Sequence, residues 1–354
     1  MKVSFKQISP TADPTHGSPC SRSSHGVSCI KIGLKTCIVV IGGEHIARTP
    51  IEDSAQSVWF ADQSSDGGWK WRSIAASSTS SAVSPPPRVA HAQTSIGDKI
   101  YIFGGRQGIT MDEKPLSDMW VLDCSGSLGE ETWSEVTYSS GSSPPEARSF
   151  HKMVSIGTNL YVFGGCGASG RLADLHKFDT TNNTWTDLGA SAKLRGRGGA
   201  NLIQLDGGNR LAVVAGFAGE ETNDGHIFDV AQSTWEAEGM SGLAELRPRS
   251  VCVSAYVPSK GVAVVFGGEV DPSDRGHEGA GGFEDDVVIL DGKTGAFKEA
   301  IRKPDTAETW PEQRGWSAGD ILDGATLYVF GGLSGDDKDP RRLDDLWQCD
   351  IHDE

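Results

Sequence analysis

The sequence lacks any hydrophobic run long enough to cross a membrane. Its longest apolar runs, such as Cys37–Ile41 and Gly261–Phe266, contain only a few residues, whereas a membrane-spanning helix needs about 20. The first residues, MKVSFKQISP, contain no apolar core of the kind found in signal peptides. We therefore expect a soluble, cytoplasmic protein that has no membrane partner.

An excess of positive charge is also lacking. Lys and Arg together number 32 against 48 Asp and Glu, which gives a formal net charge of −16 at pH 7. Such a surface repels the phosphate backbone of a nucleic acid, so we expect no nucleic-acid partner. Net charge does not determine local potential, and a small basic pocket could still hold an anion.

Paired cysteines and several well-known catalytic motifs are absent as well. The seven cysteines form no CxxC and no metal-ligand spacing, which predicts free thiols in a reducing compartment. The sequence contains no GxSxG, no Walker sequence, no HExxH and no GxGxxG between a strand and a helix. Any chemistry must therefore come from another arrangement of residues.

The sequence does contain a repeat in which a short apolar strand ends in a Gly-Gly pair. Five copies are VVIGG (39–43), YIFGG (101–105), YVFGG (161–165), VVFGG (264–268) and YVFGG (328–332). A sixth copy, VVAGF (213–217), keeps only one glycine of the pair. The copies recur at intervals of roughly fifty to sixty residues, which is the spacing of Kelch-type propeller blades.

Each repeat contains two further recurrent residues. An arginine precedes the Gly-Gly pair by about a dozen residues or more, at Arg22, Arg88, Arg148, Arg197, Arg249 and Arg314. An aromatic residue follows on a last strand, at Trp71, Trp133, Trp185, Trp235 and Phe297. The nearly continuous apolar second strand indicates a sheet covered on both faces. We expect the arginines to pair with carboxylates and backbone carbonyls, and the aromatic rings to pack between blades.

These repeats predict an all-β fold, a six-bladed Kelch-type β-propeller in a single domain over residues 1–354. The sixth repeat ends at DIHDE, before a fourth strand. The alternating segment VSFKQIS (3–9) resembles a lone strand. We therefore expect the N-terminal strand to complete the last blade and close the ring, which removes the free sheet edges.

The loop after the fifth Gly-Gly pair is the strongest candidate for a metal site. It holds Glu269, Asp274 and His277 within nine residues. A histidine combined with carboxylates suits a first-row divalent metal such as non-haem Fe(II). The alternative is a polar surface loop that binds nothing, because the spacing matches no stereotyped motif.

Two arginines outside the repeated series are candidates for binding an anion. Arg106 directly follows the second Gly-Gly pair, and Arg171 lies in the equivalent loop of the third repeat. Two guanidinium groups beside the Glu269 loop could hold a sulfate or a carboxylate bidentately. Trp316 and Phe217 could line the same mouth with apolar walls, although packing between blades is an equal alternative for each. Cys166, in the same region, is expected to be an inert thiol.

The chain as a whole resembles a family of plant proteins. The resemblance is carried by RSSHGVSCIKIG with VVIGGE, RSFHKMVSIGTNLYVFGG, RGRGGANLIQL with VVAGFAG, RSVCVSAYV with VVFGGE, and RGWSAGDIL. These segments look like the specifier proteins of glucosinolate breakdown, which include nitrile-specifier, thiocyanate-forming and epithiospecifier proteins. The resemblance extends over essentially every blade, including the irregular fourth and the RGW of the sixth.

This resemblance implies an Fe(II)-dependent lyase. It would act on an unstable sulfated thiohydroximate, the glucosinolate aglucone, and direct it to nitrile or thiocyanate-type products. The family's ligands form a Glu-x3-Asp-x3-His motif, to which Glu269 and His277 correspond. Ser273 stands at the middle position, with Asp274 one residue later and Asp271 two earlier. The family's sulfate-contacting arginines correspond to Arg106 and Arg171, and its pocket tryptophan to Trp316.

Several functions remain open at this stage. The first is the iron-dependent lyase, in which Arg106 and Arg171 stabilise the departing sulfate and a glycosidase that supplies the substrate is a functional partner. The second is a Kelch protein-interaction scaffold, since fold alone does not decide function. The third is a metal-free propeller that binds a small metabolite. A copper oxidase fits less well, because only five tyrosines are present.

Overall fold

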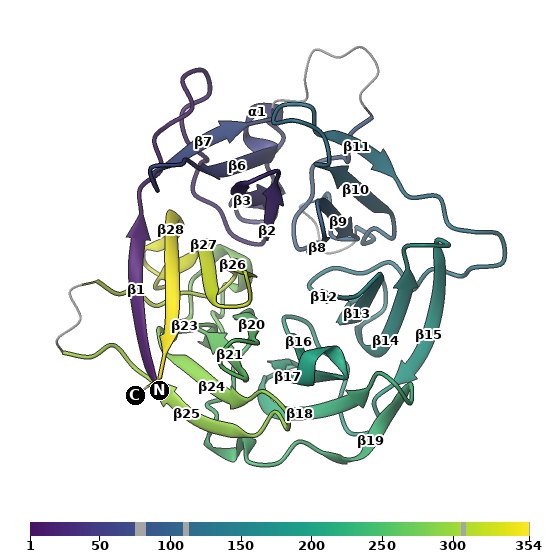
Figure 1. Cartoon of the computed structure of the whole chain (residues 1–354). Coiled ribbons are helices and arrows are strands. Elements are labelled where there is room, and N and C mark those ends of the chain that lie inside the picture. Colours follow the sequence, from purple (N-terminus) through teal and green to yellow (C-terminus); the bar gives the residue numbers. More distant parts are fainter. Residues whose placement is uncertain (75–82, 109–112, 306–308, 354) are drawn as a thin grey trace.

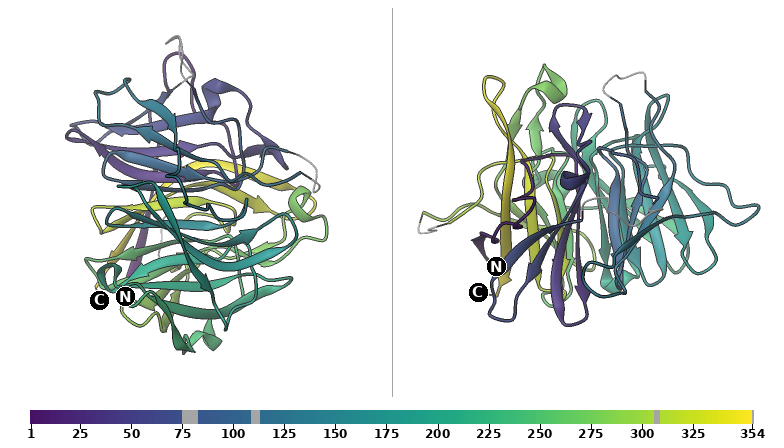
Figure 2. Two further views of the ribbon diagram at one scale, coloured as in Figure 1. Left: turned by 90° about the vertical axis from the view of Figure 1, so that its right-hand side faces the viewer. Right: turned by 90° about the horizontal axis from the view of Figure 1, so that it is seen from above.

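The computed structural model describes residues 1–74, 83–108, 113–305 and 309–353. In these residues, six four-stranded antiparallel sheets surround a central channel (Figure 1), which confirms the predicted propeller. The first strands of neighbouring blades contact each other around the axis. In the views from the side and from above, the two termini lie together at the rim (Figure 2).

Each blade consists of four strands in sequence order from the channel outward, except that the sixth takes its outermost strand from the N-terminus. Blade one contains β2 (Gly26–Ile32), β3 (Lys35–Ile41), β6 (Val58–Gln63) and β7 (Trp69–Ser73). Blade two contains β8 (Ala92–Ile96), β9 (Lys99–Phe103), β10 (Met119–Asp123) and β11 (Thr132–Glu135). Blade three contains β12 (Lys152–Ile156), β13 (Asn159–Cys166), β14 (Arg171–Asp179) and β15 (Thr184–Ala190). Blade four contains β16 (Asn201–Leu205), β17 (Arg210–Phe217), β18 (Glu221–Asp229) and β19 (Thr234–Gly239). Blade five contains β20 (Val253–Val257), β21 (Val262–Phe266), β24 (Val287–Asp291) and β25 (Phe297–Ile301). Blade six contains β26 (Ala318–Leu322), β27 (Thr326–Gly335), β28 (Pro340–His352) and β1 (Lys2–Ile8).

Short elements decorate the loops between these strands. Two small hairpins, β4–β5 and β22–β23, follow the first and fifth Gly-Gly pairs. Their bounds, with those of the short helices, are β4 (Glu44–Ile46), β5 (Thr49–Pro50), β22 (Glu269–Asp271), β23 (Gly282–Phe283), α1 (Ser54–Ser57), η1 (Asp206–Gly208), η2 (Leu243–Glu245) and η3 (Gly276–Glu278). Within the described ranges, no helix is long and apolar enough to span a bilayer.

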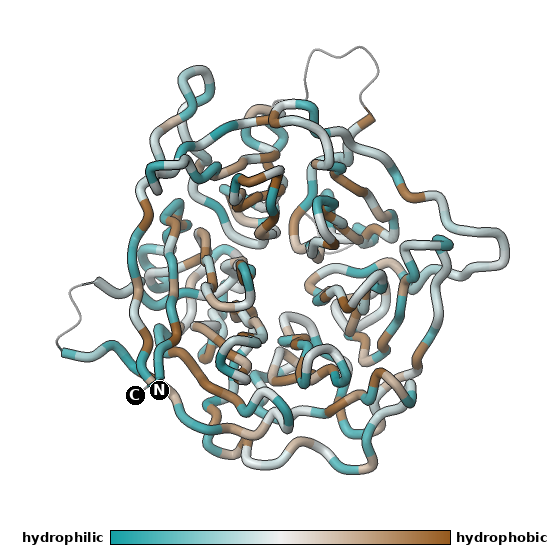
Figure 3. Tube along the Cα trace, viewed as in Figure 1, coloured by the Kyte–Doolittle hydropathy of each residue, from teal (hydrophilic) through white to brown (hydrophobic). Residues whose placement is uncertain are grey.

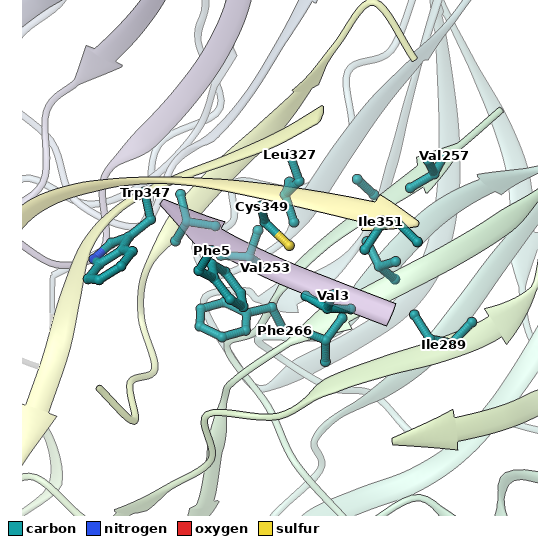
Figure 4. Packing of buried hydrophobic residues seen from close by; sticks show 14 of the residues in the cluster. Val3, Phe5, Val253, Val257, Phe266, Ile289, Leu327, Trp347, Cys349 and Ile351 are labelled. Atoms are coloured by element: carbon teal, nitrogen blue, oxygen red, sulfur yellow. The ribbon is translucent and has the colours of Figure 1, made fainter. Parts of the chain in front are cut away.

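The N-terminal strand closes the ring as predicted. β1 pairs antiparallel with β28, with Val3 opposite Ile351 and Phe5 opposite Cys349. Phe5 is 6% exposed, and its ring contacts Phe266 of blade five and Trp347 of blade six. Figure 4 shows these side chains meeting between the two blades. Closure therefore adds apolar burial as well as strand pairing.

Packing between blades uses the aromatic residues of the repeat. Trp235 on the outer strand of blade four contacts Phe163 of blade three, and Trp185 of blade three contacts Phe103 of blade two. Trp71 of blade one meets Phe330 of blade six in the same way. Hydrophobic segments accordingly concentrate in the strands, whereas the peripheral loops are more hydrophilic (Figure 3). The predicted role of these tryptophans is confirmed.

The repeated arginines are buried at the inner edge of the blades, with 0–2% of each exposed. Arg249 shows the pattern: its guanidinium donates to the carbonyl of Gly267 at 3.1 Å and to both carboxylate oxygens of Asp286 at 2.6 and 3.2 Å. Four other blades repeat the arginine–aspartate pair, while blade one uses Gln56 instead. Each arginine precedes its first strand by four residues instead of opening it, because its own backbone is used in contacts between blades.

The second glycine of each pair makes the contact with the next blade. Gly268 donates its N–H to the carbonyl of Arg314 at 2.8 Å. It has φ +106°, and a Cβ there would lie only 2.7 Å from the Ser250 carbonyl oxygen. Left-handed backbone and lack of space both require glycine. In blade four the first glycine is replaced by Ala215, which keeps a φ of +60°.

Replacing Asp286 by Asn should destabilise the propeller by about 3–5 kcal/mol, because the buried Arg249 guanidinium would lose its compensating charge. Urea unfolding followed by tryptophan fluorescence measures the effect. Asp353→Asn is the matched control: Asp353 pairs with Lys260 at 2.6 Å but is 73% exposed, so its loss should cost less than about 1 kcal/mol. Equal destabilisation of the two variants would contradict a special role for the buried pair.

Candidate functional site

One end of the channel presents six equivalent positions, one from each blade. The residue that follows the second glycine forms an isolated β-bridge with the residue that follows the repeated arginine. The six pairs are Glu44–Ser23, Arg106–Val89, Cys166–Ser149, Phe217–Gly198, Glu269–Ser250 and Leu333–Gly315. The repeat fixes the backbone at these positions, and the six side chains belong to five residue types, with glutamate in both blade one and blade five. The mouth therefore combines acidic, basic and apolar groups on one rigid frame.

A closed ring of backbone hydrogen bonds crosses the blades at this mouth. Its members lie two residues after each arginine, and each N–H donates to the carbonyl of the preceding blade's member at 2.8–3.0 Å. The members are Ser24, Ala90, Phe150, Gly199, Val251 and Trp316, and all have φ between +50° and +59°. A β-branched residue such as Val251 seldom adopts this conformation, and such strain is often found at functional sites.

The mouth contains a pocket of about 280 Å³. Five of the residues predicted from sequence line it: Arg106, Arg171, Phe217, Glu269 and Trp316. The structure thus brings together the two arginines, both aromatic residues and one carboxylate from five different blades. Further lining residues include Glu44, Arg48, Phe150, Cys166, Ser250 and Ser273.

Aromatic rings form the apolar part of the pocket. Trp316 of blade six meets Phe150 of blade three edge to face, with ring centroids 5.5 Å apart. The guanidinium of Arg171 lies 4.6 Å from the centroid of the Phe217 ring, a cation–π contact. Sequence reasoning missed Phe150, although Ser149-Phe150 occupies the same repeat position as Gly315-Trp316. Aligning the repeats after the arginine would have found it.

The basic part of the pocket contains three arginines. Arg106 Nε donates to Ser149 Oγ at 2.9 Å, and Arg48 Nε is buried with no hydrogen-bond partner among the described residues. In the part of the chain that the structure describes, none of Arg48, Arg106 and Arg171 forms an ion pair with a carboxylate. Sequence reasoning missed Arg48, which follows the first Gly-Gly pair by five residues, although Arg171 lies at a similar distance after its own pair. Three guanidinium groups without acidic partners suit an anionic ligand.

Glu44 is the acidic residue of blade one, and its charge is compensated. Arg342 Nη2 lies 3.3 Å from one carboxylate oxygen. The same oxygen accepts hydrogen bonds from Ser23 Oγ and Ser24 Oγ at 3.1 and 3.2 Å. The other oxygen accepts a hydrogen bond from the backbone N–H of Arg48 at 2.6 Å. Glu44 therefore has no free capacity for a cation and serves to fix the β4–β5 hairpin.

Glu269 is the acidic residue of blade five, and its charge is not compensated. It is 8% exposed, and no lysine or arginine among the described residues pairs with it. Burial raises the pKa of the Glu269 carboxyl to about 7, and the negative charge of Asp337 also raises this pKa. The hydrogen bond from the backbone N–H of Ser273 lowers it. A buried carboxyl without a cationic partner is a favourable position for a bound cation.

The other predicted metal ligands are placed less centrally. Asp274 is exposed and does not line the pocket. The backbone of His277 lies in η3, but its side chain is outside what the structure describes. Asp271 pairs with Arg247 at 3.0 Å. Among the side chains that are described, no three His, Cys, Asp or Glu residues stand close enough to hold a metal.

A second perturbed carboxyl, which sequence reasoning missed, belongs to Glu221. One oxygen accepts a hydrogen bond from Ser250 Oγ at 3.1 Å, and the other is buried without a partner in the described part of the protein. Burial, followed by the charge of Glu269, raises the pKa of Glu221 to about 8. The blade-four and blade-five carboxyl groups therefore interact beneath the acidic side of the pocket.

All seven cysteines are free. Cys166 is partly exposed in the pocket, and burial raises the pKa of its thiol despite the nearby charges of Arg171 and Arg106. A thiol with a raised pKa is a poor nucleophile at neutral pH. The structure agrees with the expectation of an inert group.

Comparison with known proteins gives one family and several relatives. Residues 81–268, more than half of the chain, match the family described as the KLHDC2/KLHL20/DRC7 Kelch-repeats domain. The chain is 27% identical over 324 residues to N-(sulfonatooxy)prop-2-enimidothioate sulfolyase of Thlaspi arvense, covering 85% of this chain and 84% of that protein. The chain is thus similar to a sulfolyase over most of the length of both.

Other relatives share only the repeats. Identity is 30% over 265 residues with Leucine-zipper-like transcriptional regulator 1 of Pongo abelii, and the match covers 70% of this chain but 28% of that protein. Identity with Host cell factor of Drosophila melanogaster is 29% over 210 residues, and the match covers 51% of this chain and 14% of that protein. Among solved structures, YjhT superimposes with a TM-score of 0.64 at 14% identity over 93% of this chain and 95% of YjhT, which supports the fold alone.

In the metal-free protein, Glu221→Gln should have a higher free energy of unfolding than the wild type. The difference should grow as pH rises from about 5 to about 9. The ordinary carboxyl pKa is 4.5 and the folded value is about 8. The folded state therefore holds the proton more tightly, and the wild type loses stability as pH rises between these values. Gln has no proton to lose.

Urea unfolding at several pH values tests this prediction. Glu220→Gln is the matched control, because Glu220 is 71% exposed and pairs with Arg195 at the surface. Parallel pH profiles for Glu221→Gln and the wild type would show that Glu221 ionises as an ordinary carboxyl.

Proposed function

The chain belongs to the Kelch-repeat family, and we propose that it is an iron-dependent lyase of the specifier type that acts on a sulfated thiohydroximate or a related small anion. The observation that carries this proposal is the composition of the mouth pocket. Three arginines that have no acidic partner among the described residues, and a buried carboxyl that has no cationic partner among them, line a cavity of about 280 Å³. A protein-binding scaffold does not require this arrangement.

The relative from Thlaspi arvense supports the choice of substrate class. Its name describes a sulfolyase acting on N-(sulfonatooxy)prop-2-enimidothioate. Such a molecule carries a sulfate ester at one end and an apolar side chain at the other. The pocket offers arginines for the first and the rings of Trp316, Phe150 and Phe217 for the second.

The residues of the acidic side fit a divalent cation. Glu269 is buried and unpaired, and a cation would remove the cost of burying its charge. Glu269 and His277 are proposed as two ligands, and Asp274 is a candidate for a third from its place in the loop. When bound, Fe(II) would supply a Lewis acid that polarises the substrate. Carboxylate and imidazole donors suit that ion.

The arginines act on the leaving group. In the reaction to a nitrile, the bond between nitrogen and the sulfonatooxy oxygen breaks, and its electron pair leaves with the sulfate. The electron pair of the carbon–sulfur bond forms the third carbon–nitrogen bond, and the sulfur leaves as neutral sulfur. Negative charge on that oxygen therefore increases in the transition state. Guanidinium groups already fixed in place, such as Arg106 held by Ser149, bind this charge more strongly as it develops.

The aromatic rings position the rest of the substrate. Trp316 and Phe150 pack against each other and are held by the backbone ring at the floor of the pocket. They exclude water from one side of the cavity, which strengthens electrostatic interactions there. We further propose that a glycosidase releases the substrate in the vicinity of this protein, because a sulfated aglucone is unstable.

Wild-type protein reconstituted without oxygen should bind about one Fe(II) per chain, and Glu269→Ala and His277→Ala should each lose it. Glu269 belongs to the small hairpin β22–β23 and the backbone of His277 to η3, both outside the six four-stranded sheets, so the propeller should remain folded. Elemental analysis after dialysis measures the metal, and circular dichroism checks the fold. Full iron content in both variants would refute the site, and a wild type without specific iron would favour a metal-free binding role.

Replacing Arg106 or Arg171 by Gln should lower kcat/KM for the sulfated aglucone by about 10- to 100-fold, since each removes a charged hydrogen bond. The assay measures nitrile or thiocyanate formed while a glycosidase releases the aglucone. Arg195→Gln is the control, because Arg195 is 61% exposed and pairs with Glu220. An equal loss in all three variants would point to a general effect of charge instead of pocket contacts.

A further inference from the structure

The channel contains two further cavities beneath the mouth pocket. The upper cavity, of about 60 Å³, lies directly under the closed ring of backbone hydrogen bonds, because all six members of that ring line it. The lower cavity, of about 130 Å³, is lined largely by the first strands of the blades. One water molecule needs about 10–15 Å³ by this measure, so the upper cavity has room for a small ligand.

Two aromatic rings separate the upper cavity from the mouth pocket. Phe150 belongs to blade three and Trp316 to blade six, and these blades lie on opposite sides of the channel (Figure 1). Their rings nevertheless meet edge to face, with centroids 5.5 Å apart. Both residues line the mouth pocket as well as the upper cavity. The pair therefore extends across the channel and forms a partition between the two spaces.

Lys152 is the charged residue of the upper cavity. Among the described residues that line this cavity, no other lysine, arginine, aspartate or glutamate is present. The Lys152 side chain extends from blade three to blade five, where Nζ donates to the carbonyl of Cys252 at 3.4 Å. No carboxylate in the described part of the chain pairs with it. Because an ammonium group has three donors, Lys152 keeps capacity for a ligand.

The position of Lys152 makes its charge costly when no ligand is bound. Burial lowers the pKa of Lys152, which means that the surrounding protein disfavours the charged form of the amine. An anion beside Nζ would favour that charged form and oppose the effect of burial. The upper cavity is therefore an electrostatically favourable position for a small anion.

Three histidines add polar groups around Lys152 without adding charge. His25, His91 and His151 line the same cavity. Burial lowers the pKa of His25 and of His91 to about 3, and that of His151 well below its ordinary value. The ring nitrogens of His91 and His151 are buried and lack a hydrogen bond of ordinary geometry among the described residues. Since a neutral imidazole carries one N–H, each of these two rings has a donor for an anion.

A carboxylate distinguishes the lower cavity from the upper one. Asp320 of blade six lines only the lower cavity, whereas Lys152 lines both. The Asp320 oxygens accept the backbone N–H groups of Cys29 and Ile321, each at 2.8 Å. An anion in the lower cavity would be repelled by Asp320. The charges of the channel therefore favour the upper cavity.

We propose that the upper cavity is a second binding site, for a small oxyanion such as sulfate, held by Lys152 and by the N–H groups of His91 and His151. The site itself requires neither iron nor the lyase reaction. Only the choice of sulfate rests on the proposed function, in which sulfate leaves the substrate in the pocket above. The Phe150–Trp316 partition separates this site from the arginines of the mouth.

Isothermal titration calorimetry of the iron-free protein with sodium sulfate, at constant ionic strength, tests the inference. The arginines of the mouth also attract sulfate, so the double variant Arg106→Gln, Arg171→Gln serves as the reference. It should still bind about one sulfate per chain. Adding Lys152→Gln should weaken this binding by at least about tenfold, because a charged hydrogen bond is lost. Adding Lys193→Gln instead should have little effect, since Lys193 is 46% exposed and lies near Glu238 at the surface.

Two results would overturn the inference while circular dichroism shows folded protein. The first is loss of all sulfate binding in the double arginine variant, which would leave the mouth as the site. The second is an effect of Lys152→Gln no larger than that of Lys193→Gln. Neither result bears on iron binding or on the lyase reaction, which have their own measurements.

The position of the anion is tested by crystals grown with selenate, a heavier analogue of sulfate. The anomalous signal of selenium should lie within hydrogen-bond distance of Lys152 Nζ, on the channel side of the Phe150–Trp316 pair. A signal confined to Arg106 and Arg171 would place the anion in the mouth and contradict the inference.

Discussion

Six buried arginines determine how the blades of this propeller are joined. Each guanidinium spans its own blade, from the carbonyl at the first position of the Gly-Gly pair to a side chain beside the third strand. Each arginine carbonyl accepts the N–H of the second residue of the preceding blade's pair. A buried charge is costly unless fully paired. The arginine, the two pair residues and the aspartate are therefore one interdependent unit in blades two to six, and Gln56 takes the place of the aspartate in blade one.

This unit fixes the backbone next to it and leaves the side chains there unconstrained. The residue directly after each arginine forms the β-bridge to the mouth position. The second residue after each arginine belongs to the closed ring of backbone hydrogen bonds. Glu44, Arg106 and Phe217 thus occupy geometrically equivalent positions with different side chains. A rigid frame with variable positions is well suited to building a precise site. Function here depends on which side chain each blade presents.

Local charge at the mouth opposes the charge of the whole chain. The protein carries a net charge of −16, yet its pocket holds three arginines without acidic partners in the described residues. On the acidic side, Glu269 lacks a cationic partner, whereas Glu44 has Arg342. Two residues at the same repeat position therefore differ in charge pairing because of their neighbours: Glu44 pairs with Arg342, and Glu269 has no lysine or arginine partner among the described residues.

The sequence by itself determined the fold, the blade order, the ring closure by residues 3–9 and five of the residues that line the pocket, because those features repeat along the chain or lie beside repeated motifs. It did not identify Phe150, Arg48 or Glu221, whose positions depend on how the blades face one another. Only the tertiary structure joined Ser273 of blade five to Asp337 of blade six, with both Asp337 and Asp274 exposed. Residues that meet from different blades have no characteristic spacing in sequence, since their separation is set by the ring.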